Sequence, residues 1–194
     1  MKLLGLTGGV GMGKSNAAGF FLRHGVRVVD TDELARQLVQ PGQPALTEIL
    51  AAFGNHLVAD SGGLKRNELA RMVFADAVAR KKLEDILHPR IRETWLKQIE
   101  VWRGENCPFA MVVIPLLFET GAENHFEKIV CVSCSLPTQQ RRLAGRGWPA
   151  EQISQRIKAQ LPMEQKVARS HYVIWTEGEL TVHEQQVSRI CGRL

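Results

Sequence analysis

The sequence predicts an α/β protein built on a doubly wound parallel sheet of five strands, and three observations support this. Short apolar runs near residues 3, 27, 111, 131 and 173 alternate with stretches of helical periodicity. A glycine-rich segment joins the first run to the first helical stretch, and the region between the second and third runs stays helical. At 194 residues, the chain has room for one sizeable domain and a small inserted lobe.

The glycine-rich segment, Gly8–Ser15, follows the apolar run Leu3–Leu6 and has the Walker A pattern GxxxxGKS. Glycines let successive main-chain N–H groups turn toward an anion, and the helix predicted over 17–22 adds its positive N-terminal end. Lys14 is then expected to reach the β- and γ-phosphates of a nucleotide, and the Ser15 hydroxyl to ligate Mg²⁺. The alternative is a glycine-rich turn that holds no ligand. We name Gly8–Ser15 the phosphate loop.

A second strand is predicted over Val26–Val29, after a first helix that ends near His24, and it leads into Asp30-Thr31-Asp32. Ligands of open α/β sheets gather at the carboxyl ends of strands, so these acids should face the same crevice as the phosphate loop. They suit two tasks, which are holding Mg²⁺ or its waters and accepting the proton of an attacking hydroxyl. Alternatively, Asp32 or Thr31 caps a helix over 33–40.

The region between the second and third strands is predicted to be a helical insert. Pro44 opens a helix that Gly54 closes, 60–63 forms a turn, and 67–102 keeps three- and four-residue apolar steps. Because a proline can begin a helix but not continue one, we expect a break at Leu87-His88-Pro89. His88 either has a functional role or caps the new helix. A phosphotransferase of this architecture would hold its acceptor in this insert.

Three further strands and two helices complete the predicted core: strands over Phe109–Ile114, Ile129–Ser133 and Tyr172–Trp175, and helices from Pro137 and over Leu180–Ile190. The first of these strands runs into Pro115-Leu116-Leu117-Phe118-Glu119. Glu119 either reaches the crevice at the carboxyl ends of the strands or is a solvated loop acid.

The formal net charge of +5 fits a nucleic acid, a membrane surface or a small polyanionic substrate as the partner. Basic residues outnumber acids seven to two over 141–169: Arg141, Arg142, Arg146, Arg156, Lys158, Lys166 and Arg169 against Glu151 and Glu164. Few aromatic residues are interleaved there, which disfavours a platform that stacks single-stranded bases. A lid that closes over phosphates fits this stretch better.

Four cysteines do not make a secreted disulfide framework in a chain of this length. Cys131 and Cys134 have the spacing of a metal or redox pair, but they lie at a predicted strand, where side chains three apart point to opposite faces. We therefore expect buried structural thiols. No window reaches the ~18 apolar residues of a membrane span, and the N-terminus lacks a signal-peptide core, so we expect a cytoplasmic protein without a membrane partner.

Several motifs together resemble the dephospho-CoA kinase family. They are the phosphate loop, Val29–Asp32 followed by Ala35-Arg36, Leu87–Pro89, Pro115–Glu119, Gln139–Leu143 with Arg146, and Arg156-Ile157 with Gln160 and Lys166. Their order and spacing are specific, and they cover nearly the whole chain.

The resemblance implies an ATP-dependent kinase that phosphorylates the ribose 3′-hydroxyl of dephospho-CoA in the last step of coenzyme A synthesis. The implied fold is a P-loop NTPase-type doubly wound parallel five-stranded sheet with a helical substrate-binding insert and a small helical lid. The core spans about 1–40, 107–137 and 170–194, the acceptor-binding insert about 41–106, and the lid about 138–169. The implied partners are ATP, Mg²⁺ and dephospho-CoA, with no nucleic acid, and the chain is expected to be a monomer or a weak homo-oligomer.

The resemblance also assigns roles to single residues. Asp32 is the base at the acceptor hydroxyl, and Lys14 and Arg142 assist catalysis. The residues expected to bind ATP are Gly8, Gly9, Gly11, Met12, Gly13, Lys14, Ser15, Asn16 and Arg146, with Ser15 also on the metal. The residues expected on the acceptor side are Thr7, Asp32, His88 and Leu117.

The chain departs from the family pattern at four positions. Met12 stands where serine is usual in the phosphate loop, and Asn16 where threonine is usual. Neither position needs its side chain for the phosphate cradle. His171 replaces a usual Asp and Thr176 a usual Asn, which bears on the adenine-side contacts and on how the lid is anchored.

Two alternative functions fit the same phosphate loop. One is a kinase of another small hydroxyl acceptor, such as a nucleoside or a sugar. The other is a nucleotide-dependent switch or a nucleic-acid-binding ATPase. A guanine-specific switch carries Asn-Lys-x-Asp, and none of the five asparagines is followed by lysine. Binding to a nucleic acid would weaken steeply with salt.

Overall fold

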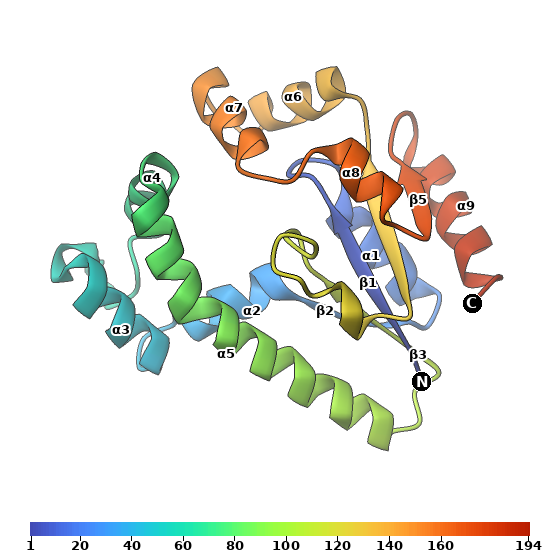
Figure 1. Ribbon diagram of the computed structural model, residues 1–194, viewed down its shortest axis with the longest axis horizontal. Helices are drawn as coiled ribbons and strands as arrows, with labels where there is room; N and C mark the ends of the chain where they lie inside the picture. The colour runs from blue at the N-terminus through green and yellow to red at the C-terminus, as the bar shows by residue number, and fades with distance from the viewer. The chain divides into compact units, whose positions relative to one another are not determined.

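The computed structural model describes all residues, Met1–Leu194, and its contacts divide the chain into two compact units. The first unit combines Met1–Asp30 with Val101–Leu194 and contains the sheet. The second unit, Thr31–Glu100, is mostly helical (Figure 1).

Five parallel strands form the centre of the first unit, in the order β2-β3-β1-β4-β5 (Figure 1). They are β1 (Lys2–Gly8), β2 (Arg27–Asp30), β3 (Phe109–Val113), β4 (Lys128–Ser133) and β5 (Tyr172–Trp175). The order reverses at β1, whose Leu6 is in register with Val113 on one side and Val130 on the other. This confirms the predicted doubly wound parallel sheet.

Both faces of the sheet are covered, which explains why its strands are continuous apolar runs. On one face, Leu4 of β1 packs in a core with side chains of α1 (Lys14–Arg23) and α9 (Leu180–Cys191). On the other face, a Cβ at Gly5 would lie 2.7 Å from Cδ1 of Leu117, so the loop after β3 packs directly against β1.

The remaining helices of the first unit follow β4. They are α6 (Leu136–Ala144), α7 (Ala150–Lys158) and α8 (Met163–Ala168), and a 3₁₀ turn, η2 (Glu123–His125), precedes β4. The side chain of Ser135 caps α6 by accepting a hydrogen bond from Thr138 N at 3.3 Å.

The second unit has its own small core. Its helices are α2 (Thr31–Leu38), α3 (Pro44–Phe53), α4 (Arg66–Ala75) and most of α5 (Ala77–Gly104), with a 3₁₀ turn, η1 (Asn55–Leu57). The buried side chains that meet at the centre are Val39, Ile49, Leu57, Leu69 and Val73.

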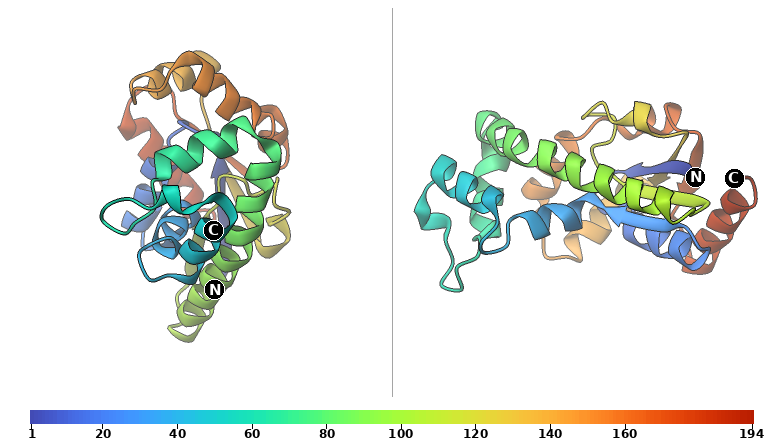
Figure 2. Two further views of the ribbon diagram at one scale, coloured as in Figure 1. Left: turned by 90° about the vertical axis from the view of Figure 1, so that its left-hand side faces the viewer. Right: turned by 90° about the horizontal axis from the view of Figure 1, so that it is seen from below.

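The predicted break at Leu87-His88-Pro89 is wrong, because Pro89 lies inside α5. Figure 2 shows α5, in green, as one continuous helix. An interior proline costs about 3 kcal/mol. Ile86 and Leu87 pack against the core of the second unit, and burying several such side chains offsets that cost. The break falls instead at the extended residue Asp76, whose carboxylate accepts from Val78 N at 2.8 Å and starts α5. His88 therefore caps no helix.

Candidate nucleotide site

The phosphate loop connects the carboxyl end of β1 to the first turn of α1, as the sequence predicts. Gly8, Gly11 and Gly13 have φ angles of 145°, 76° and 95°, which L side chains rarely adopt. A Cβ at Gly8 would lie 2.2 Å from the carbonyl oxygen of Val132 in β4. The path of the main chain thus requires glycine at these positions. The same path places the phosphate loop at the N-terminus of α1, where main-chain N–H groups lack helical partners.

Lys14 folds back over the phosphate loop. Its Nζ donates hydrogen bonds to the carbonyl oxygens of Gly8 and Gly9, at 2.9 and 3.0 Å. The ammonium sits on a flexible four-carbon stem, so it can move from these carbonyls to a phosphate oxygen. Together with the N-terminus of α1, it gives the loop the positive potential that an anion requires.

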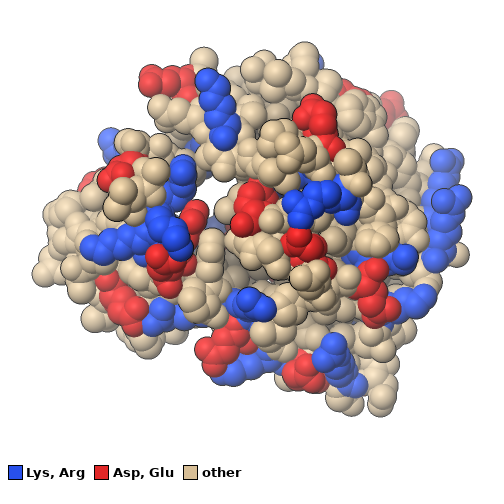
Figure 3. All heavy atoms as spheres, viewed as in Figure 1, with Lys and Arg blue, Asp and Glu red and all other residues tan.

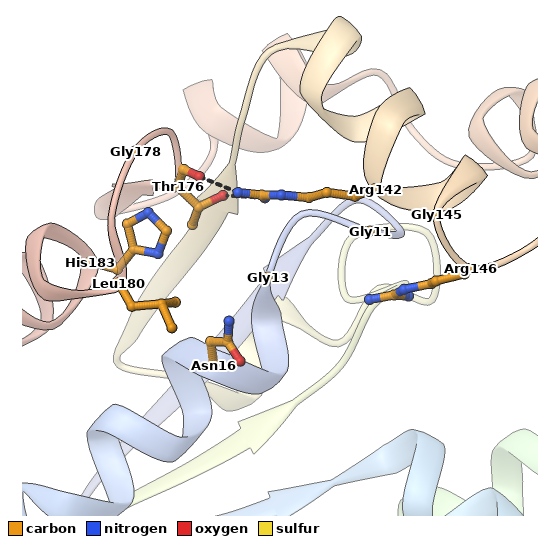
Figure 4. A pocket seen from close by; sticks show the side chains of 10 residues that line it. All are labelled: Gly11, Gly13, Asn16, Arg142, Gly145, Arg146, Thr176, Gly178, Leu180 and His183. Atoms are coloured by element: carbon orange, nitrogen blue, oxygen red, sulfur yellow. Dashed lines mark hydrogen bonds between the residues drawn. The ribbon is translucent and has the colours of Figure 1, made fainter.

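A cavity of about 450 Å³ opens beside the phosphate loop (Figure 4). It is lined by Gly11, Gly13, Asn16, Arg142, Gly145, Arg146, Thr176, Gly178, Leu180 and His183. The structure therefore brings together five residues predicted for the nucleotide or the lid, namely Gly11, Gly13, Asn16, Arg142 and Arg146. Sequence reasoning missed Gly178, Leu180 and His183, because they lie just before α9 and in its first turn and belong to no chemical motif.

Arg142 crosses the cavity to Thr176 (Figure 4). Its Nη1 donates to Thr176 Oγ1 at 2.9 Å, and its Nη2 donates to the Thr176 carbonyl oxygen. The buried Thr176 hydroxyl also lies 2.8 Å from the carbonyl oxygen of Met12 in the phosphate loop. The threonine that replaces the usual asparagine thus links the phosphate loop to α6.

Next to Thr176, the carboxylate of Glu177 is held by hydrogen bonds from the start of α6. Oε1 accepts from Ser135 N at 2.8 Å, and Oε2 accepts from Thr138 Oγ1 at 2.9 Å. These bonds, with those of Ser135 the largest cause, lower the pKa of Glu177 to about 2. The segment after β5 is therefore tied to α6 by an ionised acid at neutral pH.

Glu119 forms an ion pair with Lys166 at 2.8 Å and accepts a hydrogen bond from Leu161 N at 2.8 Å. Lys166 is fully buried and also donates to the carbonyl oxygen of Pro115 at 2.8 Å. Glu119 is thus an exposed loop residue whose carboxylate is paired, and its predicted reach into the crevice stays a prediction. Lys166, a member of the basic stretch predicted to form the lid, joins α8 to the loop after β3.

Thr7 and Leu117 were predicted to line the acceptor side, and both are fully buried. Thr7 Oγ1 donates to the Pro115 carbonyl oxygen at 3.2 Å, and Leu117 packs toward Gly5. Their assignment to the acceptor stays a prediction.

Asp32 lies within the first turn of α2, because the helix begins at Thr31 directly after β2 ends at Asp30. Its side chain is exposed, and a carboxylate in a first turn is favoured by the helix dipole. His88 is half-buried in the middle of α5. The roles predicted for Asp30, Asp32 and His88 stay predictions.

Cys131 and Cys134 are free, buried thiols, as expected. Burial raises the pKa of Cys131 to about 11 and also raises that of Cys134. No three His, Cys, Asp or Glu side chains are placed to hold a metal ion together. None of the helices has the length and apolar character to cross a membrane. On the face in Figure 3, basic and acidic side chains are interspersed.

Comparison with known proteins identifies the family. The sequence model of the dephospho-CoA kinase family matches residues 2–181. A dephospho-CoA kinase of Moorella thermoacetica is 42% identical over 183 residues, covering 93% of this chain and 86% of the relative.

Solved structures agree in fold over the whole chain. A protein from Thermus thermophilus superposes with a TM-score of 0.81 and 30% identity, covering 100% of this chain and 97% of the other. The dephospho-CoA kinase of Campylobacter jejuni gives a TM-score of 0.72 and 25% identity, with the same coverage. The fold is that of the P-loop kinases, and the chain belongs to the dephospho-CoA kinase family.

Proposed function

We propose that the chain transfers the γ-phosphoryl group of ATP to the ribose 3′-hydroxyl of dephospho-CoA, giving coenzyme A and ADP. The family match over residues 2–181 is the observation that carries the choice of acceptor. The phosphate loop, with three glycines at positive φ in front of α1, supports the choice of donor.

Positive charge is the main catalytic requirement, because the transferred phosphoryl group spreads negative charge over its oxygens and the protein mostly positions the partners. In the proposal, Lys14, Arg142 and Arg146 supply this charge. Lys14 lies on the phosphate loop, and both arginines line the cavity beside it. Arginine suits these positions because its planar fork binds phosphate bidentately and stays charged.

The proposal includes Mg²⁺, held by the Ser15 hydroxyl and by nucleotide phosphates. Ser15 fits, because it is an exposed hydroxyl in the first turn of α1, next to the phosphate loop lysine. Mg²⁺ seldom needs a protein cage of several carboxylates when phosphates are present. When bound, the ion neutralises charge on the β- and γ-phosphates.

In the transfer itself, the 3′-oxygen bonds to the γ-phosphorus while the bond from that phosphorus to the β–γ bridging oxygen breaks. Asp32 is proposed to accept the proton of the 3′-hydroxyl. Thr7, His88 and Leu117 are proposed for the acceptor side, within a division into core, acceptor-binding insert and lid. The proposal places the enzyme in the cytoplasm as a monomer or weak homo-oligomer that needs no nucleic acid.

An acceptor panel tests the function. Purified protein is incubated with ATP and Mg²⁺ and with dephospho-CoA, adenosine, shikimate or gluconate, and kcat/KM is measured for each. We expect dephospho-CoA to be preferred, with coenzyme A detected by mass. A higher kcat/KM for any other acceptor would contradict the proposal. The variant Lys14→Met controls for a contaminating kinase.

A further inference from the structure

The main chain of Val10, in the middle of the phosphate loop, is held from outside by two glutamine side chains. Val10 N–H donates to Oε1 of Gln160 at 2.9 Å, and Val10 C=O accepts from Nε2 of Gln139 at 2.8 Å. Gln139 lies in α6, and Gln160 follows α7. Because a main-chain N–H can only donate and a carbonyl only accept, the orientation of each side-chain amide is determined.

Each bond fixes the plane of one peptide. The Val10 carbonyl shares a trans peptide with the N–H of Gly11, and the two groups point in opposite directions. Gln139 therefore turns the Gly11 N–H away from itself, and Gly11 lines the nucleotide cavity. Likewise, by holding Val10 N–H, Gln160 sets the direction of the Gly9 carbonyl, which accepts from Lys14 Nζ at 3.0 Å.

The packing around Gln139 leaves it little freedom. Gln139 is only 3% exposed. Its Nε2 is so close to the phosphate loop that a Cβ added at Gly9 would lie 3.1 Å from it. Leu143, one turn further along α6, also packs closely on the loop, because a Cβ added at Gly11 would lie 2.9 Å from its Cδ2. A loop this rich in glycine has many accessible conformations, so contacts from outside are needed to select one.

We propose that Gln139 and Gln160 are positioning residues, which set the Gly9–Val10 and Val10–Gly11 peptides in the orientation that binds nucleotide phosphate. The inference rests on the proposed function only in that a nucleotide occupies the phosphate loop. Both glutamines act through the main chain of Val10. Their loss should weaken nucleotide binding and leave acceptor binding unchanged.

The first test replaces each amide by a side chain of similar length that makes no hydrogen bond. The variants are Gln139→Met and Gln160→Met, and the control is Gln140→Met, which alters the exposed neighbour on α6. The Kd of ADP is measured by calorimetry, together with the KM of both substrates and the melting midpoint. We expect ADP binding about tenfold weaker in each test variant, the effect of one lost hydrogen bond of about 1.4 kcal/mol.

The remaining measurements separate positioning from general stability. The KM for dephospho-CoA should stay within about twofold of the wild-type value, since the substitutions change only the free energy of nucleotide binding. A merely structural role would lower the melting midpoint and leave the ADP Kd of the folded protein unchanged. If both methionine variants bind ADP as the Gln140→Met control does, the proposal is overturned.

A second pair of variants adds the same charge at both positions. Gln160→Glu keeps an oxygen that accepts from Val10 N–H, whereas Gln139→Glu removes the donor and sets a carboxylate against the Val10 carbonyl. We expect Gln160→Glu to bind ADP at least about fivefold more tightly than Gln139→Glu. Equal affinities would contradict the assigned orientations. These binding measurements need no acceptor, so a wild type that binds ADP without phosphorylating dephospho-CoA would refute only the proposed function.

Discussion

Arg142 and Thr176, which both line the cavity beside the phosphate loop, are joined by two hydrogen bonds, from Nη1 to Oγ1 at 2.9 Å and from Nη2 to the carbonyl oxygen. The same Oγ1 lies 2.8 Å from the carbonyl oxygen of Met12. One buried hydroxyl therefore orients Arg142 of α6 and contacts the phosphate loop. This arrangement couples α6 to the loop through a side chain that carries no charge.

Replacing this hydroxyl by a methyl group should affect both stability and nucleotide binding. In Thr176→Val, the half-buried Arg142 loses the acceptor of its Nη1 and the Met12 carbonyl loses a buried donor, so we expect the free energy of unfolding to fall by about 1–3 kcal/mol. The Kd of ADP should rise as Arg142 loses its orientation. Urea unfolding and calorimetry measure the two effects. The control Thr181→Val, on the exposed start of α9, should change neither.

Asp32→Asn tests the proposed base. The amide keeps the size of the side chain but cannot accept the hydroxyl proton, so kcat should fall on the order of 10²-fold or more. ADP binding should remain nearly unchanged. Glu33→Gln, the neighbouring exposed acid in the first turn of α2, is the matched control. Near-normal turnover in Asp32→Asn would remove the residue from this role.

The ion pair of Lys166 and Glu119 should contribute strongly to stability. Lys166→Met leaves the Glu119 carboxylate, whose side chain is 19% exposed, without its buried partner. We expect a loss of about 3 kcal/mol in the free energy of unfolding, and a smaller loss when Glu119→Gln is added to the same chain. Lys158→Met, at the exposed end of α7, is the control. If the loss of unfolding free energy in the double variant equals the sum of the losses in Lys166→Met and Glu119→Gln, the two residues are not coupled.

Glu177 predicts how stability depends on pH. Its pKa is lowered from 4.5 to about 2 in the folded chain, so the folded state binds fewer protons than the unfolded state between these values. The stabilisation is fully present above about pH 4.5 and is lost as the pH falls toward 2. Glu177→Gln should be less stable at pH 7 and lose less stability between pH 4.5 and 3. Parallel pH profiles of the two proteins would contradict this.

Most of the fold follows from the sequence, because parallel strands and amphipathic helices leave clear periodic patterns. The phosphate loop was predicted with its flanking strand and helix, since its glycines are required by backbone angles such as the φ of 95° at Gly13. The continuity of α5 was not predicted. The rule that proline ends a helix considers only local structure, and here the packing of Ile86 and Leu87 against the core outweighs the cost of Pro89.

The candidate site was predicted less completely. Arg142 and Arg146 line the same cavity as Gly11. Their predicted contact with nucleotide phosphates stays a prediction. Lys166 belongs to the same basic stretch and yet is buried, paired with Glu119 from the distant loop after β3. Sequence periodicity cannot reveal such a long-range pair. The contacts of Gln139 and Gln160 with Val10 are equally invisible, because they involve the main chain.

Under the proposed function, ATP donates its terminal phosphoryl group to the 3′-hydroxyl of dephospho-CoA. The most direct test is to measure ADP and product together, with the position of the new phosphate assigned by phosphorus NMR. We predict one ADP for each coenzyme A formed and a phosphomonoester on the 3′-oxygen. ADP released without coenzyme A, or a phosphate on another oxygen, would contradict the proposed function.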